Sequence, residues 1–398
     1  MDVKNFERLR YTNNFYKRII DQMSVQIIGA EETDKELMDY LCESINKFGF
    51  KTLIGNLDPD IKNTYRESSI IGYSFSQLYN ESSLTGNITM NLLTIFILND
   101  KTRCVYDKTK KADELIVLNS KDYENGFPSS EDIYNILNNE IFSKVNIIIP
   151  WSGGWDSTLV YLKVLGTKLF KRISVPFCSS ENLQTQKQRE ARDMISEELK
   201  KLIDSLYSEE LEKIDDVGDC DICEILDNEI NINIPDASHM PSMPTRNQLP
   251  MIFTTMMYSC SCSKNIVLYP IIKQDNWSKD DITSFKEGFI NFCSAYSGNN
   301  IAAIVDFPLI EYDKVDVIEE IFKFEKDYDI SIHDKIYTCE CGYNICSYDP
   351  CKSCKVEREA LESSKNPDVH EYFLEKYEKE GLTKKEEYFE KLQEGLKK

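Results

Sequence analysis

An eight-residue stretch directly after an apolar run constrains the fold of this chain more than any other feature. The apolar run spans residues 145–149, and the stretch reads Trp151, Ser152, Gly153, Gly154, Trp155, Asp156, Ser157 and Thr158. A short apolar run that ends at glycines predicts a buried strand, and the residues that follow predict a turn into a helix. The sequence therefore favours an α/β fold with a glycine-rich loop at the end of one strand.

The residue types of this loop suit phosphate. Two adjacent glycines let the backbone take a positive φ and approach phosphate oxygens without a Cβ clash. Successive N–H groups at a helix start form an anion-binding nest, to which Ser152, Ser157 and Thr158 add hydroxyl donors. Bare phosphate would repel Asp156, so we expect this carboxylate to hold Mg²⁺ or to orient the nest from the side. The alternative is a tight turn without a ligand.

The motif resembles the PP-loop of the N-type ATP pyrophosphatases. This resemblance implies cleavage of ATP between its α and β phosphates, adenylation of a carboxylate or carbonyl oxygen, and displacement of AMP by a nucleophile. It implies ATP and Mg²⁺ as cofactors and Asp156 as a catalytic residue. The implied nucleotide-binding residues are Ser152, Gly153, Gly154, Asp156, Ser157 and Thr158. The motif leaves the acceptor of the adenylation open.

Composition narrows the partners. The 398 residues carry a formal net charge of -21, which is poorly suited to holding a long nucleic-acid backbone. We therefore do not expect direct nucleic-acid binding. No apolar run approaches the length of a membrane-spanning helix, and the N-terminus lacks a signal-peptide pattern. These observations predict a cytoplasmic protein that does not contact a membrane.

Five of the 13 cysteines fall in one short segment rich in turn-forming residues. They are Cys339, Cys341, Cys346, Cys351 and Cys354. Four thiolates around Zn²⁺ need such a loop-rich scaffold, and the segment ends in a C-x-x-C knuckle. We expect zinc ligands at Cys339, Cys346, Cys351 and Cys354, within residues 337–358, with Cys341 as a spare or a substitute. The alternative is a loop of reduced cysteines without a metal.

The loop and the cysteine segment together resemble QueC, the 7-cyano-7-deazaguanine synthase. Further segments match in the same order: a strand at 173–177, a helix opening at 188–192, a Pro-x-Arg-Asn segment at 244–247, a strand at 265–269, and Pro-Leu at 308–309 before a helix at 315–328. The resemblance covers about residues 145–362. It implies a Rossmann-like parallel sheet of the PP-loop class over residues 141–362, with a C-terminal zinc knuckle.

The matched segments suggest further site residues. Arg246 is a fixed cation suited to the phosphates of ATP or to departing pyrophosphate, and Lys314 could neutralise the charge that develops there. Asp281 is the candidate reader of the guanine-like face of a 7-deazapurine, and Asn247 and Trp155 are the other candidate substrate contacts. Surface salt bridges are the alternative for the charged residues. The bulk of Trp155 departs from the QueC pattern, as does Asp281-Ile282-Thr283, where QueC has Asp-Cys-Arg.

The resemblance to QueC does not cover the N-terminal and C-terminal segments of the chain. Residues 1–140 predict an α+β accessory or recognition domain, with a strand at 87–98, an antiparallel return at 102–107 and a short strand at 116–118. A helix at 131–139, capped by Ser129 and Ser130, is expected to link this domain to the body. Asp2 excludes an N-terminal-nucleophile glutaminase. Residues 363–398 are expected to form charged amphipathic helices that pack on the body or on a partner.

QueC-like proteins with added domains are also found in bacterial anti-phage systems of the type IV CBASS and Qat kinds. The resemblance implies activation of the carboxylate of 7-carboxy-7-deazaguanine and its transfer to an amine, with the N-terminus of a partner protein as one acceptor. A plain 7-cyano-7-deazaguanine synthase that uses ammonia is the first alternative. A non-catalytic nucleotide-sensing or interaction subunit is the second, and a homodimer is compatible with either.

Overall fold

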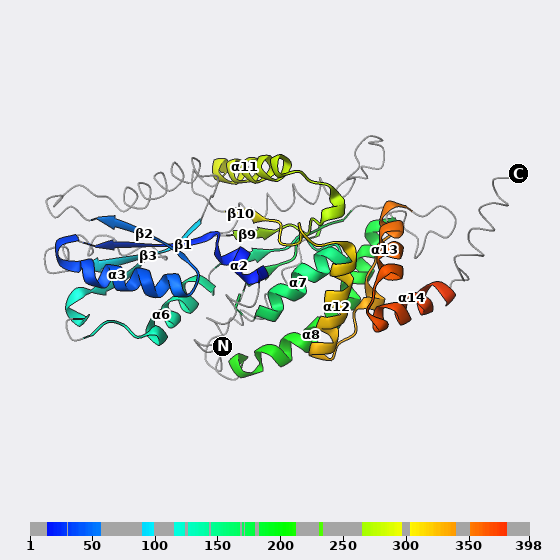
Figure 1. Ribbon diagram of the computed structural model, residues 1–398, viewed down its shortest axis with the longest axis horizontal. Coiled ribbons are helices and arrows are strands. Elements are labelled where there is room, and N and C mark those ends of the chain that lie inside the picture. Colours follow the sequence, from blue (N-terminus) through cyan, green and yellow to red (C-terminus); the bar gives the residue numbers. More distant parts are fainter. Residues whose placement is uncertain are drawn as a thin grey trace, which may run out of the picture.

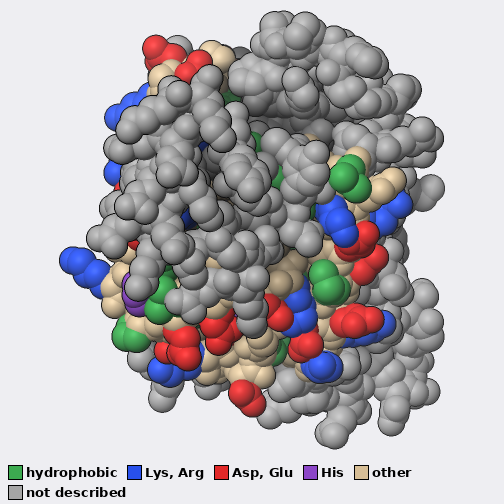
Figure 2. Space-filling model, turned by 90° about the vertical axis from the view of Figure 1, so that its right-hand side faces the viewer, with side chains coloured by type: hydrophobic (Ala, Val, Ile, Leu, Met, Phe, Trp, Pro, Cys, Tyr) green, Lys and Arg blue, Asp and Glu red, His purple; other side chains and the backbone are tan. Residues whose placement is uncertain are grey.

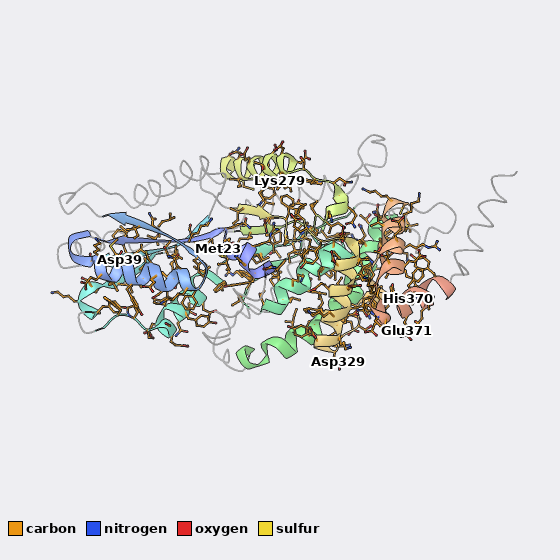
Figure 3. The ribbon with its side chains drawn as sticks, viewed as in Figure 1. Met23, Asp39, Lys279, Asp329, His370 and Glu371 are labelled. Atoms are coloured by element: carbon orange, nitrogen blue, oxygen red, sulfur yellow. The ribbon has the colours of Figure 1, made fainter. Side chains whose placement is uncertain are left out.

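The computed structural model describes residues 14–29, 31–56, 90–98, 115–123, 126–142, 145–167, 169–170, 172–179, 183–211, 231–233, 265–296, 303–339 and 351–379. The described strands form two four-stranded sheets and one two-stranded sheet, and every strand pair is parallel. The molecule is elongated, with the first sheet at one end and the C-terminal helices at the other (Figure 1). Asp39 and His370 accordingly lie toward opposite ends of the long axis (Figure 3).

The second sheet is a parallel sheet buried on both faces. Its strands are β5 (Asn146–Ile148), β6 (Arg172–Ser174), β9 (Asn265–Leu268) and β10 (Ala303–Asp306), in the order β10-β9-β5-β6. Successive side chains point to opposite faces. One face carries Ile147, Ile266, Leu268 and Ile304, in a core shared with α7 (Trp155–Thr167) and α12 (Lys314–Tyr328). The other carries Ile148, Val267, Ala303 and Val305, packed against α11 (Lys279–Tyr296). The structure thus has a Rossmann-like α/β sheet over the segment where the sequence predicts one.

Several elements of this region confirm the expectations, and one does not. The strand expected at 265–269 is β9, and the helix expected at 315–328 is α12. The helix expected to open at 188–192 is α8 (Leu183–Leu211), which begins earlier than predicted and buries Ala191, Ile195, Leu199 and Leu202. The single strand expected at 173–177 is wrong: the chain forms β6 and then β7 (Phe177–Ser179), which pairs with β8 (Asn231–Asn233) in a separate sheet. Pro176 lies between them and has no N–H to continue a ladder.

The first sheet belongs to the N-terminal part of the chain. Its strands are β1 (Met23–Gly29), β2 (Lys51–Asn56), β3 (Met90–Leu98) and β4 (Leu115–Asn119), in the order β2-β1-β3-β4. The helices α2 (Asn14–Ile20) and α3 (Glu31–Lys47) flank β1 in the sequence, and α3 packs on β1 and β2. The strands β3 and β4 lie where the sequence predicts strands at 87–98 and 116–118, while β1 and β2 were not predicted. The arrangement differs from the expected α+β domain, because β3 pairs in parallel with both β1 and β4.

Both four-stranded sheets have the same topology. In each, the first strand in the chain is internal, the second lies on one side of it, and the third and fourth follow on the other side. The first strand of such a sheet marks a topological switch point, because the connections leave it in opposite directions. For the N-terminal sheet, the expected return strand at 102–107 lies outside the described residues.

The segment between the two sheets is helical and buries its apolar side chains. Ser129 is the N-cap of α6 (Ser130–Leu137) in a capping box with Asp132, and a π-helical turn, η2 (Asn138–Phe142), continues it. The expected cap is thus confirmed, while the helix ends in a turn that the sequence did not predict. One apolar core runs through both sheets: the Phe142 ring lies 5.8 Å from the Phe50 ring and 5.6 Å from the Phe170 ring. Arg18 of α2 forms an ion pair with Asp306 of β10 at 3.2 Å, so charged groups also join the two halves.

The C-terminal helices complete the body. They are α13 (Lys352–Ser363) and α14 (Pro367–Lys379), preceded by the 3-10 turns η4 (Lys273–Asp275) and η5 (His333–Lys335); a further 3-10 turn, η1 (Ser120–Tyr123), follows β4. The helix α13 packs against α12 and α14. The predicted packing of a charged C-terminal helix on the body is confirmed for α14, while residues 380–398 lie outside the described part.

Acidic and basic side chains are interspersed among the described residues of the face that Figure 2 presents, which is the right-hand side of Figure 1. Each helix in the described ranges is too short or too polar to cross a bilayer.

Candidate functional site

The glycine-rich loop leaves the internal strand β5 at the switch point of the second sheet. The strand β5 pairs with β6 on one side and β9 on the other, and the loop at 149–154 leads from its carboxyl end into α7. In open α/β sheets, the crevice outside the carboxyl ends of the strands at the switch point is the usual ligand site. The fold therefore places the loop where a parallel sheet most readily binds a ligand.

Gly153 determines the path of this loop. Its φ is +75°, in the left-handed region that residues with a Cβ rarely adopt. A Cβ at this position would lie 3.1 Å from Cγ of Arg192 and 3.1 Å from the carbonyl oxygen of Gln188, both on α8. On the other side, the backbone N–H of Tyr337 donates to the carbonyl of Gly153 at 3.2 Å. The loop is therefore held between α8 and the segment that leads to the cysteines.

The serine hydroxyls of the loop lie together. The Oγ atoms of Ser152 and Ser157 are 3.1 Å apart, and the Ser157 hydroxyl also accepts from the backbone N–H of Ser152. Thr158, predicted as the third donor, is fully buried, and its oxygen accepts from the indole Nε1–H of Trp151 at 3.0 Å. The structure thus brings Ser152, Gly154 and Ser157 together at the loop and places the Thr158 hydroxyl in the core behind it.

Asp156 and Lys314 form an ion pair beside the loop. The Nζ atom of Lys314 lies 2.7 Å and 2.8 Å from the two carboxylate oxygens of Asp156. The two residues lie in the first turns of α7 and α12, where the positive ends of two helix dipoles converge. The lysine side chain is 9% exposed and the aspartate 26% exposed, so the carboxylate remains open to a ligand from solvent. Two residues predicted separately from the sequence are therefore direct partners.

A second carboxyl group lies close to this pair. Burial raises the pKa of Asp275, at the end of η4, and the negative charge of Asp156 raises it further. The backbone N–H of Ile272, together with the positive charges of Lys314 and Lys352, opposes this rise. The carboxyl group of Asp275 therefore interacts with the charges of Asp156, Lys314 and Lys352.

Trp155 lies in the interior and not on the surface of the loop. Its side chain is buried, and its Nε1–H donates to Oε1 of Glu357 at 2.7 Å. The same oxygen accepts from Nζ of Lys376 at 2.9 Å and from the Thr338 hydroxyl at 3.1 Å. Burial alone would raise the pKa of Glu357, but Lys376 and the Trp155 donor hold it below its usual value. Trp155 was expected to contact substrate, and its polar atom is instead committed to this network.

The remaining predicted contacts fall elsewhere or outside the described residues. Asp281 is exposed at the start of α11, where its carboxylate accepts from the Ser278 backbone N–H at 2.9 Å and from the Ser278 hydroxyl at 2.6 Å. Those hydrogen bonds lower the pKa of Asp281 and commit one of its oxygens to a helix cap. Arg246 and Asn247 lie outside the part of the chain that the structure describes.

Three of the predicted zinc ligands form a cluster. The Sγ atoms of Cys339, Cys351 and Cys354 lie within 4.8 Å of one another. Cys339 ends a described segment, and Cys351 is the N-cap of α13, whose first turn carries Cys354. Each of the three offers one sulfur ligand, and their spacing could hold a metal ion. Cys341 and Cys346, the candidates for the fourth position, lie outside the described residues.

The sequence reasoning missed Asp275, Lys352 and Glu357 as members of the site. Asp275 follows shortly after the strand expected at 265–269, and this position could have indicated the sheet edge. Lys352 lies inside the C-x-x-C knuckle, for which the sequence analysis predicted a role of the cysteines alone. Glu357 offered no signal, because a glutamate on a charged helix is ordinarily solvated.

Comparisons with known proteins add little to this geometry. No family model matches the chain, and no curated protein matches it. Among solved structures, the catalytic subunit of M. jannaschii aspartate transcarbamoylase is 13% identical over 82% of this chain and 92% of that chain, with a TM-score of 0.18. A likeness of that size carries no argument about fold or function.

Proposed function

We propose that the chain binds Mg-ATP at residues 152–157 and cleaves it to AMP and pyrophosphate while it activates a carboxylate. The observation that carries this proposal is the Asp156–Lys314 pair, which lies beside a glycine loop at the switch point of a parallel sheet. Two helix N-termini and the loop backbone would supply donors for phosphate oxygens. Asp156 and Asp275 are the residues that would hold Mg²⁺, which would shield the phosphate charge during attack.

The chemistry requires only positioning and charge stabilisation from the protein. The carboxylate oxygen of the acid attacks the α-phosphorus of ATP, and the bond from this phosphorus to the bridging oxygen breaks, so pyrophosphate departs. An amine then attacks the acyl carbon, loses a proton, and expels AMP. Lys314 is proposed to stabilise the charge that develops on the phosphates. Arg246, predicted from the sequence, is proposed to bind the departing pyrophosphate.

We propose 7-carboxy-7-deazaguanine as the acid and the N-terminal amine of a protein as the acceptor. This substrate assignment rests on the resemblance of residues 145–362 to QueC. The cysteine cluster is proposed as a structural zinc site, completed by Cys346 or Cys341, because an all-sulfur site has no open position for catalysis. The thiol-rich composition suits a reducing compartment, and we propose the cytoplasm.

The proposal is tested by measuring AMP and pyrophosphate after incubation with Mg-ATP and 7-carboxy-7-deazaguanine. We expect AMP from the wild type and a loss of at least about a hundredfold in Asp156→Asn, since the variant loses charge at the reacting phosphates. Asp132→Asn is the matched control: it removes an aspartate in the first turn of α6 and should leave the rate unchanged. Equal rates in Asp156→Asn and wild type would overturn the assignment of the loop.

The acceptor is identified by the product. Ammonium and a mixture of short synthetic peptides with free N-termini are supplied in separate reactions. An acylated peptide, seen by its mass, supports transfer to a protein amine. A free amide or nitrile formed only with ammonium supports the 7-cyano-7-deazaguanine synthase alternative. If neither reaction forms AMP, the enzymatic proposal is wrong.

A further inference from the structure

Glu357 connects the loop to the C-terminal helices through a single buried oxygen. Its Oε1 accepts from Trp155 Nε1 at 2.7 Å, from Lys376 Nζ at 2.9 Å and from the Thr338 hydroxyl at 3.1 Å. The residue is 3% exposed, Trp155 is 1% exposed and the Lys376 side chain is 17% exposed, so water is a poor substitute acceptor. Removal of the carboxylate would leave a buried indole N–H and a largely buried ammonium group without their acceptor, which is costly.

The donors reach Glu357 from both sides of the cysteine cluster. Glu357 lies one helical turn after Cys354 on α13, and Thr338 directly precedes Cys339. Tyr337, next to Thr338, donates its backbone N–H to Gly153 at 3.2 Å. The loop is therefore clamped at Gly153 and again at Trp155, and each clamp comes from a residue covalently close to a cysteine of the cluster.

Trp155 transmits this clamp to the reacting end of the loop. It is the first residue of α7 and is bonded directly to Asp156, whose carboxylate forms the ion pair with Lys314. The Trp155 ring also meets Tyr372 of α14 edge to face, with centroids 6.4 Å apart. The orientation of the indole therefore fixes the orientation of the helix start on which Asp156 sits.

We propose that Glu357 is a positioning residue that orders the loop at 152–156 and couples this order to the cysteine cluster and to α14. The consequence for ATP rests on the proposed function, whereas the ordering of the loop does not. Loss of Glu357 leaves a loop that must be ordered by the nucleotide itself, so KM for ATP rises while kcat is kept.

The test measures deuterium exchange of backbone amides in the full chain without nucleotide. Trp155→Phe removes the indole donor together with part of the ring, and Glu357→Gln removes the charge while keeping the shape. We expect exchange in the peptide spanning residues 150–158 to become faster by about tenfold in both variants, with unchanged protection of β9 and β10. Removal of metal by a chelator should accelerate the same peptide in the wild type.

Glu325→Gln is the matched control. Glu325 is also buried in the C-terminal lobe, but its carboxylate accepts from the backbone N–H of His333 at 2.7 Å and faces His333 Nδ1 at 2.9 Å, and His333 is not a residue of the loop. This variant should leave loop exchange unchanged. Equal loop exchange in wild type and Glu357→Gln, or faster exchange everywhere in the chain, would overturn the positioning role. A loop insensitive to the chelator would overturn the coupling to the cysteines.

The AMP assay tests the proposed function, and the exchange experiment tests the role of Glu357 independently of it. A wild type that forms no AMP contradicts the proposed function, while its loop exchange still supports or refutes the role of Glu357. An active wild type with unchanged KM for ATP in both loop variants refutes the positioning role alone.

Discussion

Substitution of Gly153 by alanine tests the geometry of the loop without any assumption about its ligand. Its φ of +75° costs a residue with a Cβ about 1–2 kcal/mol. The added Cβ would also stand 3.1 Å from the Gln188 carbonyl oxygen, a backbone atom that cannot move aside cheaply. Overpacking of this kind costs about 1–3 kcal/mol. Gly153→Ala should therefore lower the free energy of unfolding by about 2–5 kcal/mol.

Two other glycines supply the controls. A Cβ at Gly154 would meet its nearest neighbour, Ser152 Oγ, at 3.4 Å, and its φ lies outside the left-handed region, so Gly154→Ala should cost less than about 1 kcal/mol. Gly288 is inside α11 with nothing within 4 Å of the added Cβ, and Gly288→Ala should stabilise by about 0.5–1 kcal/mol. Urea unfolding followed by circular dichroism ranks the variants. A Gly153→Ala protein as stable as Gly154→Ala would refute the clamped loop.

The remaining predictions concern a carboxyl group and the cysteines. Because burial and Asp156 raise the pKa of Asp275, the folded state retains its proton longer than the unfolded state, and stability falls as pH rises through the window just above the usual aspartate value of about 4. Asp275→Asn lacks this loss, so its stability relative to wild type should increase with pH across that window in urea titrations, and then stay constant. A pH-independent difference would contradict the shift. Cys354→Ser should reduce zinc measured by elemental analysis from about one per chain to near none and should lower the unfolding midpoint, whereas Cys42→Ser, on α3, should keep full zinc. A wild type that purifies without metal would contradict the zinc assignment.

The sequence predicted β5 and β9 of the second sheet because their signals are local. An apolar run followed by two glycines specifies a strand and a turn within ten residues or so, and β5 with α7 follows that pattern. Ser129 and Asp132 likewise specify the start of α6 through their own hydrogen bonds. What failed was the pairing of strands: the direction of β3 is set by its neighbours β1 and β4, which lie far from it in the chain.

The sequence indicated several residues of the candidate site, but not the directions in which their side chains point. Asp156 and Lys314 each carried a chemical reason to be functional, and the structure pairs them although 158 positions separate them. The direction of a side chain at a helix start has no comparable sequence signal. Trp155 was therefore predicted to contact substrate. Only the packing of α13 and α14 shows that its indole N–H has a buried acceptor.

The continuous core has a consequence for how the chain folds as it is synthesised. The N-terminal sheet leaves the ribosome first, yet Phe50 packs on Phe142, and Phe142 packs in turn on Phe170 of the second half. Part of the apolar surface of the N-terminal sheet therefore stays exposed to solvent until residue 170 has left the ribosome. Truncation near residue 140 would make that exposure permanent, so the N-terminal fragment is expected to aggregate when it is produced alone.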